Sequence, residues 1–232
     1  SPNVSLALDL SGGFEETLAR HGAARKRKKY KYQLSKFAQA GGHRTIEAKT
    51  PGEVDLLIGE FLAMVEKRFR EKGIANVFGA AEVQRFLRLL FRDALDEKEP
   101  PFVLHAVEVG GRIRAVNGYG VMKAGLVGQF RGMCNDEIAN TTPGYYLDYV
   151  NIERSCAEGK AVYDFGVGDE DYKRSWCDLE TWQFDTLLPL TAKGRAMLFY
   201  ETARAQAVRL VKSNRTAWSL VKRLRAAVAG GS

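Results

Sequence analysis

"AVYDFGVGDEDYKRSWC", residues 161–177, joins a short apolar run to a dense group of charges. Residues 161–165 have the pattern of a buried strand, and two glycines and three consecutive acidic residues follow closely. An aspartate inside a strand is unfavourable unless it is paired or takes part in chemistry. The stretch therefore predicts a strand that ends in a polar turn, whose charges are either solvated or part of a site.

The segments before this strand predict the rest of a sheet and a helix that leads into it. Residues 145–158 are expected to be helical, with Thr141, Thr142 and Pro143 marking the start and Gly159 the end. Three consecutive antiparallel strands are expected at 102–109, 112–122 and 126–134. A run of hairpins followed by a helix and a further strand predicts an α+β fold with a mixed, mostly antiparallel sheet flanked by helices.

Helical patterns lie on both sides of these strands in the sequence. Helices are expected at 14–40 (as one or two segments), 51–72, 81–95 and 191–228, and a short strand at 43–49. The predicted organisation is a basic helical segment at 1–42, a central α+β domain at 43–188, and basic amphipathic helices at 189–232.

Charge is distributed unevenly along the 232-residue chain, which has a formal net charge of +7. Residues 20–36 contain eight Lys or Arg and no acidic residue, and residues 189–232 contain nine against Glu201 alone. The body between these two segments is net acidic. Two basic ends on an acidic body predict that an anionic partner meets the ends.

Cysteine and histidine are too scattered to predict a disulfide framework or a metal site. The residues concerned are Cys134, Cys156, Cys177, His21, His43 and His105. No apolar run reaches the roughly 18 residues that a membrane-spanning helix needs. The sequence therefore predicts a protein of the reducing cytoplasm that holds no metal.

Three motifs and their order resemble a known family. They are the basic helix "ARKRKKYKYQLSKFAQAGG" (24–42), the helix "TTPGYYLDYVNIERSCAEG" (141–159), and the strand and turn "VYDFGVGDEDYKRSW" (162–176). Over residues 20–176 the chain resembles GNAT-superfamily acyltransferases of the FemAB-related, cellulose-biosynthesis (CelD-type) acetyltransferase group. That group carries an Asp-Phe-x-x-Gly-Asp-Glu-x-Tyr-Lys pattern, which residues 164–173 match.

The resemblance implies a GNAT-like acyltransferase domain that uses acyl-CoA, with acetyl-CoA as the expected co-substrate. It also implies N-acylation of a precursor of cell-surface material or exopolysaccharide, such as an amino sugar on a lipid-linked saccharide. The basic helices would then contact an anionic membrane or an anionic nucleotide regulator. The expected location is the cytoplasm, or the inner face of the membrane as a peripheral protein.

The start of the helix near Thr141 is the expected cofactor site. A helix N-terminus offers free backbone N–H groups and the positive end of the helix dipole, which suit a pyrophosphate. Gly144 would let a ligand approach closely, Thr141 and Thr142 offer hydroxyls, and the resemblance adds Tyr145 to the cofactor-binding set. The structural alternative is a helix with proline in its first turn that needs no ligand.

Four residues of the opening stretch are the expected catalytic groups. Direct acyl transfer needs a base for the proton of the acceptor and an acid for the departing thiolate. Asp164 or Asp169 would be the base and Tyr172 the acid, while Lys173 would hold a carboxylate or an anionic acceptor. The structural alternative is an aspartate bonded to the backbone, followed by a solvated turn whose Tyr172 packs into the core.

Two other functions stay open. One is a GNAT-like domain without catalysis that senses an anionic ligand, which the unusual loop at 134–142 supports. The other is nucleic-acid binding through residues 20–36, where Tyr30 and Tyr32 lie among the cations. Nucleic acid is the less favoured partner because runs of Lys and Arg on helices usually face solvent. The chain is also too short for the two GNAT-like halves of the relatives that use aminoacyl-tRNA.

Overall fold

The computed structural model describes residues 3–184 and 186–213, which form two compact units. The larger, which we call the main unit, comprises Val4–Arg68 and Asn76–Thr181. The smaller comprises Asn3, Phe69–Ala75 and the described residues from Trp182 onward. The predicted division at 42/43 and 188/189 stays a prediction.

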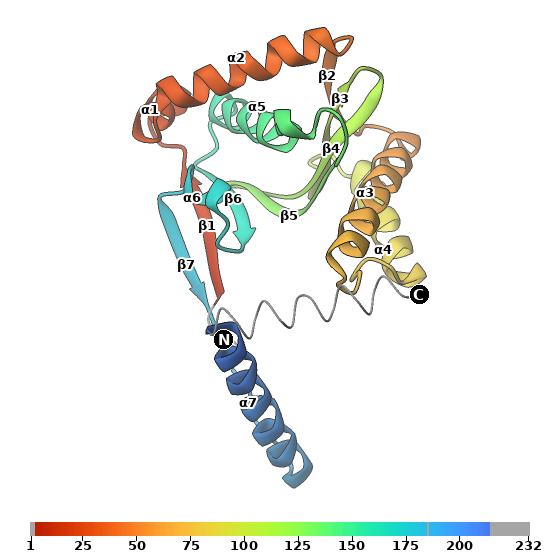
Figure 1. The fold of residues 1–232 in the computed structure, drawn as a ribbon, viewed down its shortest axis with the longest axis vertical. Coiled ribbons are helices and arrows are strands. Elements are labelled where there is room, and N and C mark those ends of the chain that lie inside the picture. Colours follow the sequence, from red (N-terminus) through yellow and green to blue (C-terminus); the bar gives the residue numbers. More distant parts are fainter. Residues whose placement is uncertain (1–2, 185, 214–232) are drawn as a thin grey trace. The chain divides into compact units, whose positions relative to one another are not determined.

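The sheet has seven strands in the order β2-β3-β4-β5-β6-β1-β7 (Figure 1). The strands are β1 (Asn3–Asp9), β2 (His43–Glu47), β3 (Phe102–Val109), β4 (Arg112–Met122), β5 (Gly125–Met133), β6 (Val162–Val167) and β7 (Leu179–Gln183). The pairs β2–β3, β3–β4, β4–β5 and β1–β6 are antiparallel, and β5 and β6 run parallel. The predicted α+β class with a mixed, mostly antiparallel sheet is confirmed.

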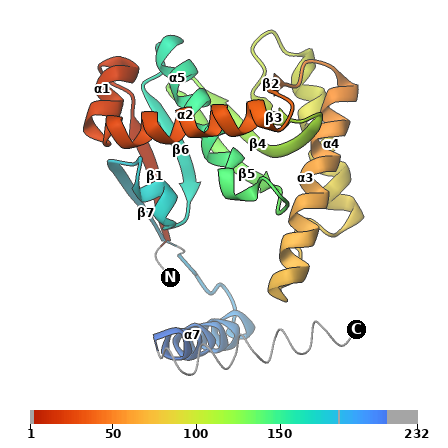
Figure 2. The same ribbon diagram turned by 45° about the horizontal axis from the view of Figure 1, so that its top comes forward.

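Helices cover both faces of this sheet (Figure 2). They are α1 (Gly13–Arg20), α2 (Ala23–Gln39), α3 (Pro51–Lys72), α4 (Ala81–Asp93), α5 (Pro143–Ala157) and the short α6 (Asp171–Arg174), with 3₁₀ turns at Ala94–Asp96 and Ala139–Thr141. On one face, Tyr119 and Tyr163 of the sheet share a buried cluster with Leu18 of α1 and Ile152 of α5. On the other face, the ring of Phe130 packs on α3 and α4.

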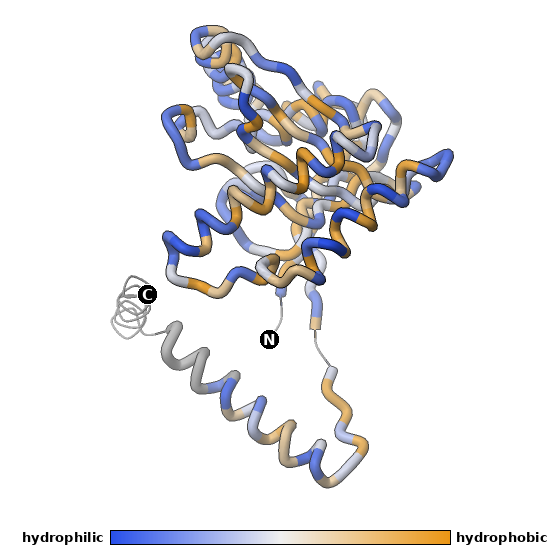
Figure 3. Tube along the Cα trace, turned by 90° about the vertical axis from the view of Figure 1, so that its right-hand side faces the viewer, coloured by the Kyte–Doolittle hydropathy of each residue, from blue (hydrophilic) through white to orange (hydrophobic). Residues whose placement is uncertain are grey.

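The two aromatic contacts on that second face are close. The ring centroids of Phe130 and Phe61 lie 4.2 Å apart, and those of Phe130 and Phe91 lie 5.6 Å apart. Figure 3 shows hydrophobic residues, in orange, concentrated where helices and sheet of the main unit meet, and hydrophilic residues on the outer turns. Burial of these apolar surfaces is the main source of stability of the layered fold.

β5 and β6 are hydrogen-bonded over a short distance only. Their parallel register runs from Gly125↔Val162 to Val127↔Asp164, although β5 continues to Met133. A β-bulge at Gln129 shifts the register of β5 against β4 at this same level. Within the described residues, the β6-facing edge of β5 has no strand pairing beyond Val127, although the two backbones stay close as far as Gly128 and Gly166.

Glycine is required where the two strands come closest. A Cβ on Gly125 would lie 1.7 Å from the carbonyl oxygen of Val162, which is far inside van der Waals contact. A Cβ on Gly166 would likewise lie 2.7 Å from the carbonyl oxygen of Gly128, so glycine permits the close contact of the two backbones at both places.

The sequence predicted neither β1, β7 nor α6. The longer helices α2, α3, α4 and α5 lie where the sequence predicted helices. The last predicted helix begins as α7 (Ala192–Ser213), which belongs to the smaller unit. The remainder of the basic amphipathic segment predicted at 189–232, residues 214–232, lies outside the described residues. Among the residues that are described, no helix is both long and apolar enough to cross a bilayer.

Candidate active site

A buried ion pair lies on the α5 face of the sheet, next to the divergence of β5 and β6. Asp148 of α5 is fully buried, and its Oδ1 accepts hydrogen bonds from Nη2 of Arg131 on β5 and, at 3.4 Å, from Oη of Tyr163 on β6. Its Oδ2 is buried and has no hydrogen-bond partner among the described residues. Burial raises the pKa of Asp148, and the Arg131 guanidinium opposes that shift.

The hydroxyls of two tyrosines form a directed chain toward this carboxylate. Tyr119 Oη accepts from Nδ2 of Asn117 at 2.7 Å and from Nδ2 of Asn151 at 3.0 Å, so its own proton goes to Tyr163 Oη, 2.7 Å away. Burial, and then the charge of Asp148, raises the pKa of Tyr119 to about 12. Both hydroxyls therefore remain protonated at neutral pH and donate toward Asp148.

Two acceptor atoms at the centre of this network receive no hydrogen bond from the part of the chain that the structure describes. They are Asp148 Oδ2 and Asn117 Oδ1, and both are buried. The two side chains are adjacent, because Asn117 Nδ2 lies 3.5 Å from Asp148 Oδ1. A buried acceptor without a donor is costly, so the arrangement suits a ligand that brings N–H or O–H groups.

Of the four predicted catalytic residues, Tyr172 lies against this ion pair, and the charge of the buried Lys173 acts on Asp148 and opposes the rise of its pKa. The guanidinium carbon of Arg131 lies 4.6 Å from the centroid of the Tyr172 ring. Burial raises the pKa of Tyr172 to about 12, so the phenol is protonated at neutral pH. That protonation state suits the acid predicted from the sequence.

The other three predicted catalytic residues bond mainly to nearby groups of the same stretch, although Asp164 Oδ1 also accepts from Ser5 Oγ of β1 at 3.3 Å. Asp164 Oδ1 accepts from the Gly166 N–H at 2.7 Å, and Lys173 Nζ donates to the Val167 carbonyl at 2.8 Å. Asp169 is exposed and forms an ion pair with Arg174. These contacts are those of the structural alternative, a turn closed by its own charged side chains.

The predicted cofactor residues lie at the start of α5, beneath α2. Gln33 of α2 is fully buried, and its Nε2 donates to the carbonyls of Thr141 at 2.7 Å and Thr142 at 3.0 Å. Both threonine hydroxyls donate to nearby backbone carbonyls. Because Pro143 has no N–H, Gly144 offers the first backbone donor of the helix. A Cβ on Gly144 would lie 3.4 Å from Met133 Sδ, which is an ordinary van der Waals contact.

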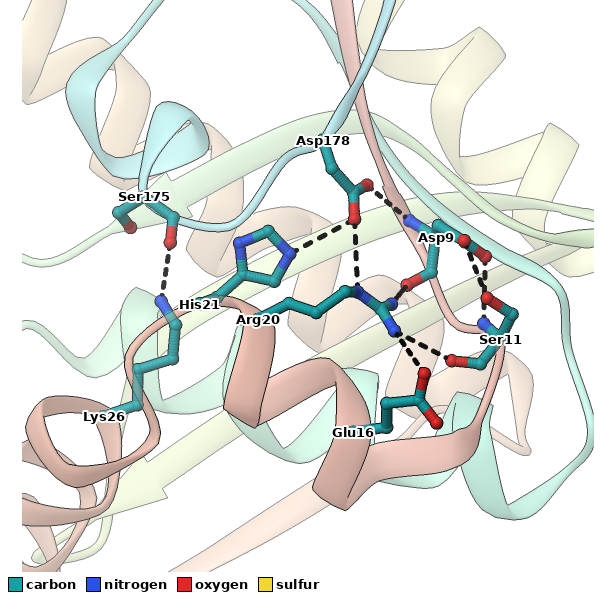
Figure 4. Close-up of polar contacts among 8 residues, drawn as sticks. All are labelled: Asp9, Ser11, Glu16, Arg20, His21, Lys26, Ser175 and Asp178. Atoms are coloured by element: carbon teal, nitrogen blue, oxygen red, sulfur yellow. Dashed lines mark hydrogen bonds and ion pairs between the residues drawn. The ribbon is translucent and has the colours of Figure 1, made fainter.

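Tyr145, the remaining predicted cofactor residue, lies within reach of the ammonium groups of α2. Lys29 Nζ is 3.7 Å from the centroid of its ring, and Lys26 Nζ is 3.4 Å from its hydroxyl. Lys26 Nζ also lies 3.6 Å from the centroid of the Trp176 ring and donates to the Ser175 carbonyl at 2.7 Å (Figure 4). Lys26 therefore joins α2 to the end of α6.

Asp178 ties the neighbouring elements together, as Figure 4 shows. Its Oδ1 accepts from the Asp9 backbone N–H at 2.8 Å, and its Oδ2 lies 3.2 Å from His21 Nε2 and 3.6 Å from Arg20 Nε. Arg20 in turn donates to the Asp9 carbonyl at 2.5 Å. These bonds hold α1 and β1 against the segment after α6.

Lys26 should make stability depend on pH. Burial first, and then the positive charges of Arg25 and Lys29, lowers its pKa from 10.5 to about 7. Below pH 7 the lysine is charged in both states and the burial penalty is present in full. Between pH 7 and 10.5 the folded protein releases the proton while the unfolded chain keeps it, so folding becomes more favourable as the pH rises.

The measurement is urea unfolding of the wild type and of Lys26→Met at several pH values. The wild type should gain stability relative to the variant from pH 7 to 9, by at most about 1.4 kcal/mol per pH unit. Parallel stability curves for the two proteins would show that Lys26 does not titrate in this range.

The sequence reasoning missed Asp148, Arg131 and Tyr119. The only local signal was an aspartate at 148 between Leu147 and Tyr149, in a helix whose neighbouring positions are apolar or aromatic. Its partner Arg131 is 17 residues earlier, on another element. The pair becomes visible only when α5 packs on β5.

Comparison with known protein families identifies one that matches most of this chain. A family described as acetyltransferase (GNAT) domain matches residues 24–174, well over half of the chain. No curated protein is significantly similar in sequence.

Several solved structures are similar to this chain at low sequence identity. One is the C-terminal domain of a putative lysylphosphatidylglycerol synthetase from Agrobacterium fabrum, with 13% identity, a TM-score of 0.47, and coverage of 71% of this chain and 46% of that one. Another is a conserved protein of unknown function from Bacteroides thetaiotaomicron, with 11% identity, a TM-score of 0.49, and coverage of 78% and 58%. The chain thus spans less than two thirds of either of these structures.

Proposed function

Because this chain belongs to the acetyltransferase (GNAT) domain family, we propose that it is an acyl-CoA-dependent N-acyltransferase with acetyl-CoA as donor. The observation that carries the proposal is the divergence of β5 and β6 beside the buried pair of Asp148 and Arg131. An extended ligand and a reacting amine could meet at that point.

The free edge of β5 suits the pantetheine arm of coenzyme A. This arm is an extended chain with two amide groups, and an unpaired strand edge offers N–H and C=O groups at matching intervals. The start of α5, at Thr142, follows β5 in the chain and would favour the pyrophosphate through its dipole. Thr141, Thr142, Gly144 and Tyr145 remain the proposed cofactor residues.

The network offers an acid and a base for direct transfer. The amine nitrogen would attack the thioester carbon, so that a C–N bond forms and the C–S bond breaks, with its electron pair left on sulfur. The proton released from nitrogen would pass to Oδ2 of Asp148, and Tyr172 would give its proton to the thiolate. Asp164 and Asp169 stay as rival bases. Asp148 is the favoured base because its Oδ2 has no hydrogen-bond partner among the described residues.

The proposed acceptor is an amino sugar of a lipid-linked saccharide used in cell-surface or exopolysaccharide synthesis. The resemblance to the CelD-type group supports this substrate, and the basic α2 would suit a phosphate-bearing acceptor at the inner face of the membrane. Sedimentation with vesicles tests the placement, which fails if anionic and neutral vesicles bind equally. We keep a cytoplasmic location as part of the proposal.

Titration calorimetry with acetyl-CoA tests the function directly. We expect a dissociation constant in the micromolar range, on the order of the KM values that enzymes show for such substrates. Release of free coenzyme A in the presence of amino-sugar acceptors would then measure turnover. A folded protein that neither binds acetyl-CoA at about 1 mM nor releases coenzyme A would point to the non-catalytic alternative.

That alternative has one observation in its favour. The carbonyls and hydroxyls of Thr141 and Thr142 are already bonded to Gln33 of α2 and to the backbone. A binding module that senses an anionic ligand elsewhere would not need these hydrogen bonds of Thr141 and Thr142 to break. Binding of acetyl-CoA without turnover on any amine would favour this second function.

A further inference from the structure

Three cations of α2 lie together without an acidic partner. They are Arg25, Lys26 and Lys29, and none of them forms an ion pair with any acid among the described residues. The neighbouring cation Arg27 differs, because it pairs with Glu15. The three, together with Tyr145 and Trp176, are called the α2 cation cluster below.

Two of these cations are withdrawn from solvent, which makes their lack of a counter-charge unusual. Lys26 is fully buried, and Lys29 is partly buried against the ring of Tyr145. Buried charges are normally paired, since desolvation of an unpaired ion is costly. The cluster therefore has unused capacity for a negative charge.

A separate observation also indicates that something is missing from this place. Nε1 of Trp176 is buried and donates to no acceptor among the described residues. The same tryptophan ring carries Lys26 Nζ at 3.6 Å. Lys26 Nζ lies over the face of this ring and already donates to the Ser175 carbonyl, so Nε1 is the donor of the pair that is left for a ligand that accepts hydrogen bonds.

The titration behaviour of the lysines agrees with this arrangement. Burial lowers the pKa of Lys26 to about 7 and also lowers the pKa of Lys29, and in both cases the charge of Arg25 adds to the effect. Cys177 opposes the shift at Lys26, and the more distant charge of Asp148 opposes it at Lys29. A bound anion would reverse the repulsion and raise both pKa values. Binding should therefore be accompanied by uptake of protons from solution.

We propose that the α2 cation cluster binds a phosphoryl group. Three cations and a neutral donor suit a multiply charged anion with several acceptor oxygens better than a single carboxylate. Tyr145 is in the first turn of α5, where the helix dipole also favours negative charge. Resting on the proposed function, the phosphoryl group belongs either to coenzyme A or to a phosphate-bearing acceptor.

The test is titration of the full chain with inorganic pyrophosphate in a phosphate-free buffer at about pH 8. Lys29→Gln combined with Arg25→Gln should weaken binding at least about tenfold. Lys28→Gln combined with Lys31→Gln removes the same charge from exposed positions on another face of α2, and should change affinity less than about twofold. Titration in buffers of different ionisation enthalpy should show net proton uptake by the wild type.

Competition identifies the source of the group. If saturating coenzyme A abolishes pyrophosphate binding, the cluster takes the phosphates of the cofactor; if both bind together, it takes those of the acceptor. No pyrophosphate binding by the wild type, or equal loss in both double variants, would overturn the site. If the protein binds pyrophosphate but not acetyl-CoA, the phosphoryl site is supported and the proposed function is contradicted.

Discussion

Asp148→Asn should lower the rate of acyl transfer by roughly two to four orders of magnitude, the range that general-base catalysis contributes. Asparagine keeps the shape of the side chain and can still accept from Arg131 and Tyr163, but an amide cannot take up the proton of the amine. Binding of acetyl-CoA should be unchanged within about twofold, because the base acts on the acceptor and not on the donor.

The measurement is coenzyme A release at saturating acetyl-CoA, with calorimetry to confirm that the donor still binds. Asp171→Asn is the matched control, because Asp171 is exposed in the first turn of α6 and touches none of the network. Asp164→Asn and Asp169→Asn test the rival bases. If one of them loses as much activity and Asp148→Asn does not, the role of base passes to that residue.

Arg131→Met should destabilise the folded protein by about 3 kcal/mol at pH 7, near the lower end of the range for breaking a buried ion pair. Methionine retains much of the apolar stem, but the fully buried carboxylate of Asp148 then has no cation. Its pKa, already raised by burial, should rise further. A carboxyl whose folded pKa exceeds the unfolded value favours folding more as the pH falls, so the loss should shrink toward pH 5.

Denaturant unfolding at pH 5 and 7 of the two single variants and their combination checks this expectation. Asp148→Asn in the Arg131→Met background should recover part of the lost stability, because the neutral amide needs no counter-charge. A loss for Arg131→Met that is the same at both pH values, and that Asp148→Asn does not relieve, would contradict the account of the pair.

The order of helices and strands could be predicted where the signal is local. Gly110 and Gly111 mark the β3–β4 hairpin, and Thr142 and Pro143 mark the start of α5, because turns and helix starts depend on a few adjacent residues. β1 and β7 could not be found in this way. Leu179–Gln183 is exposed along its whole length and so lacks the alternation of a half-buried strand.

The site shows the same division between local and distant causes. Tyr172, which lies against Arg131, could be predicted as a site residue because it belongs to a contiguous motif. The buried network draws its residues from three separate elements, namely Asp148, Arg131 and Tyr119. No local pattern in the sequence shows that Asp148 and Arg131 form an ion pair and are not two charges exposed to solvent. The catalytic roles of Asp164 and Lys173 stay predictions, because their contacts with backbone groups of the turn describe how they are held and not what they do.

The position of β1 has a consequence for how the chain folds during synthesis. Residues 3–9 are made before β6, their partner in the sheet, with which they pair in the register Ser5↔Val167 to Asp9↔Val162. This strand must therefore wait until more than 150 further residues have been made, and closing so long a loop slows folding. Until β6 has been made, β1 cannot form this pairing, and its unpaired backbone N–H and C=O groups are open to aggregation during synthesis.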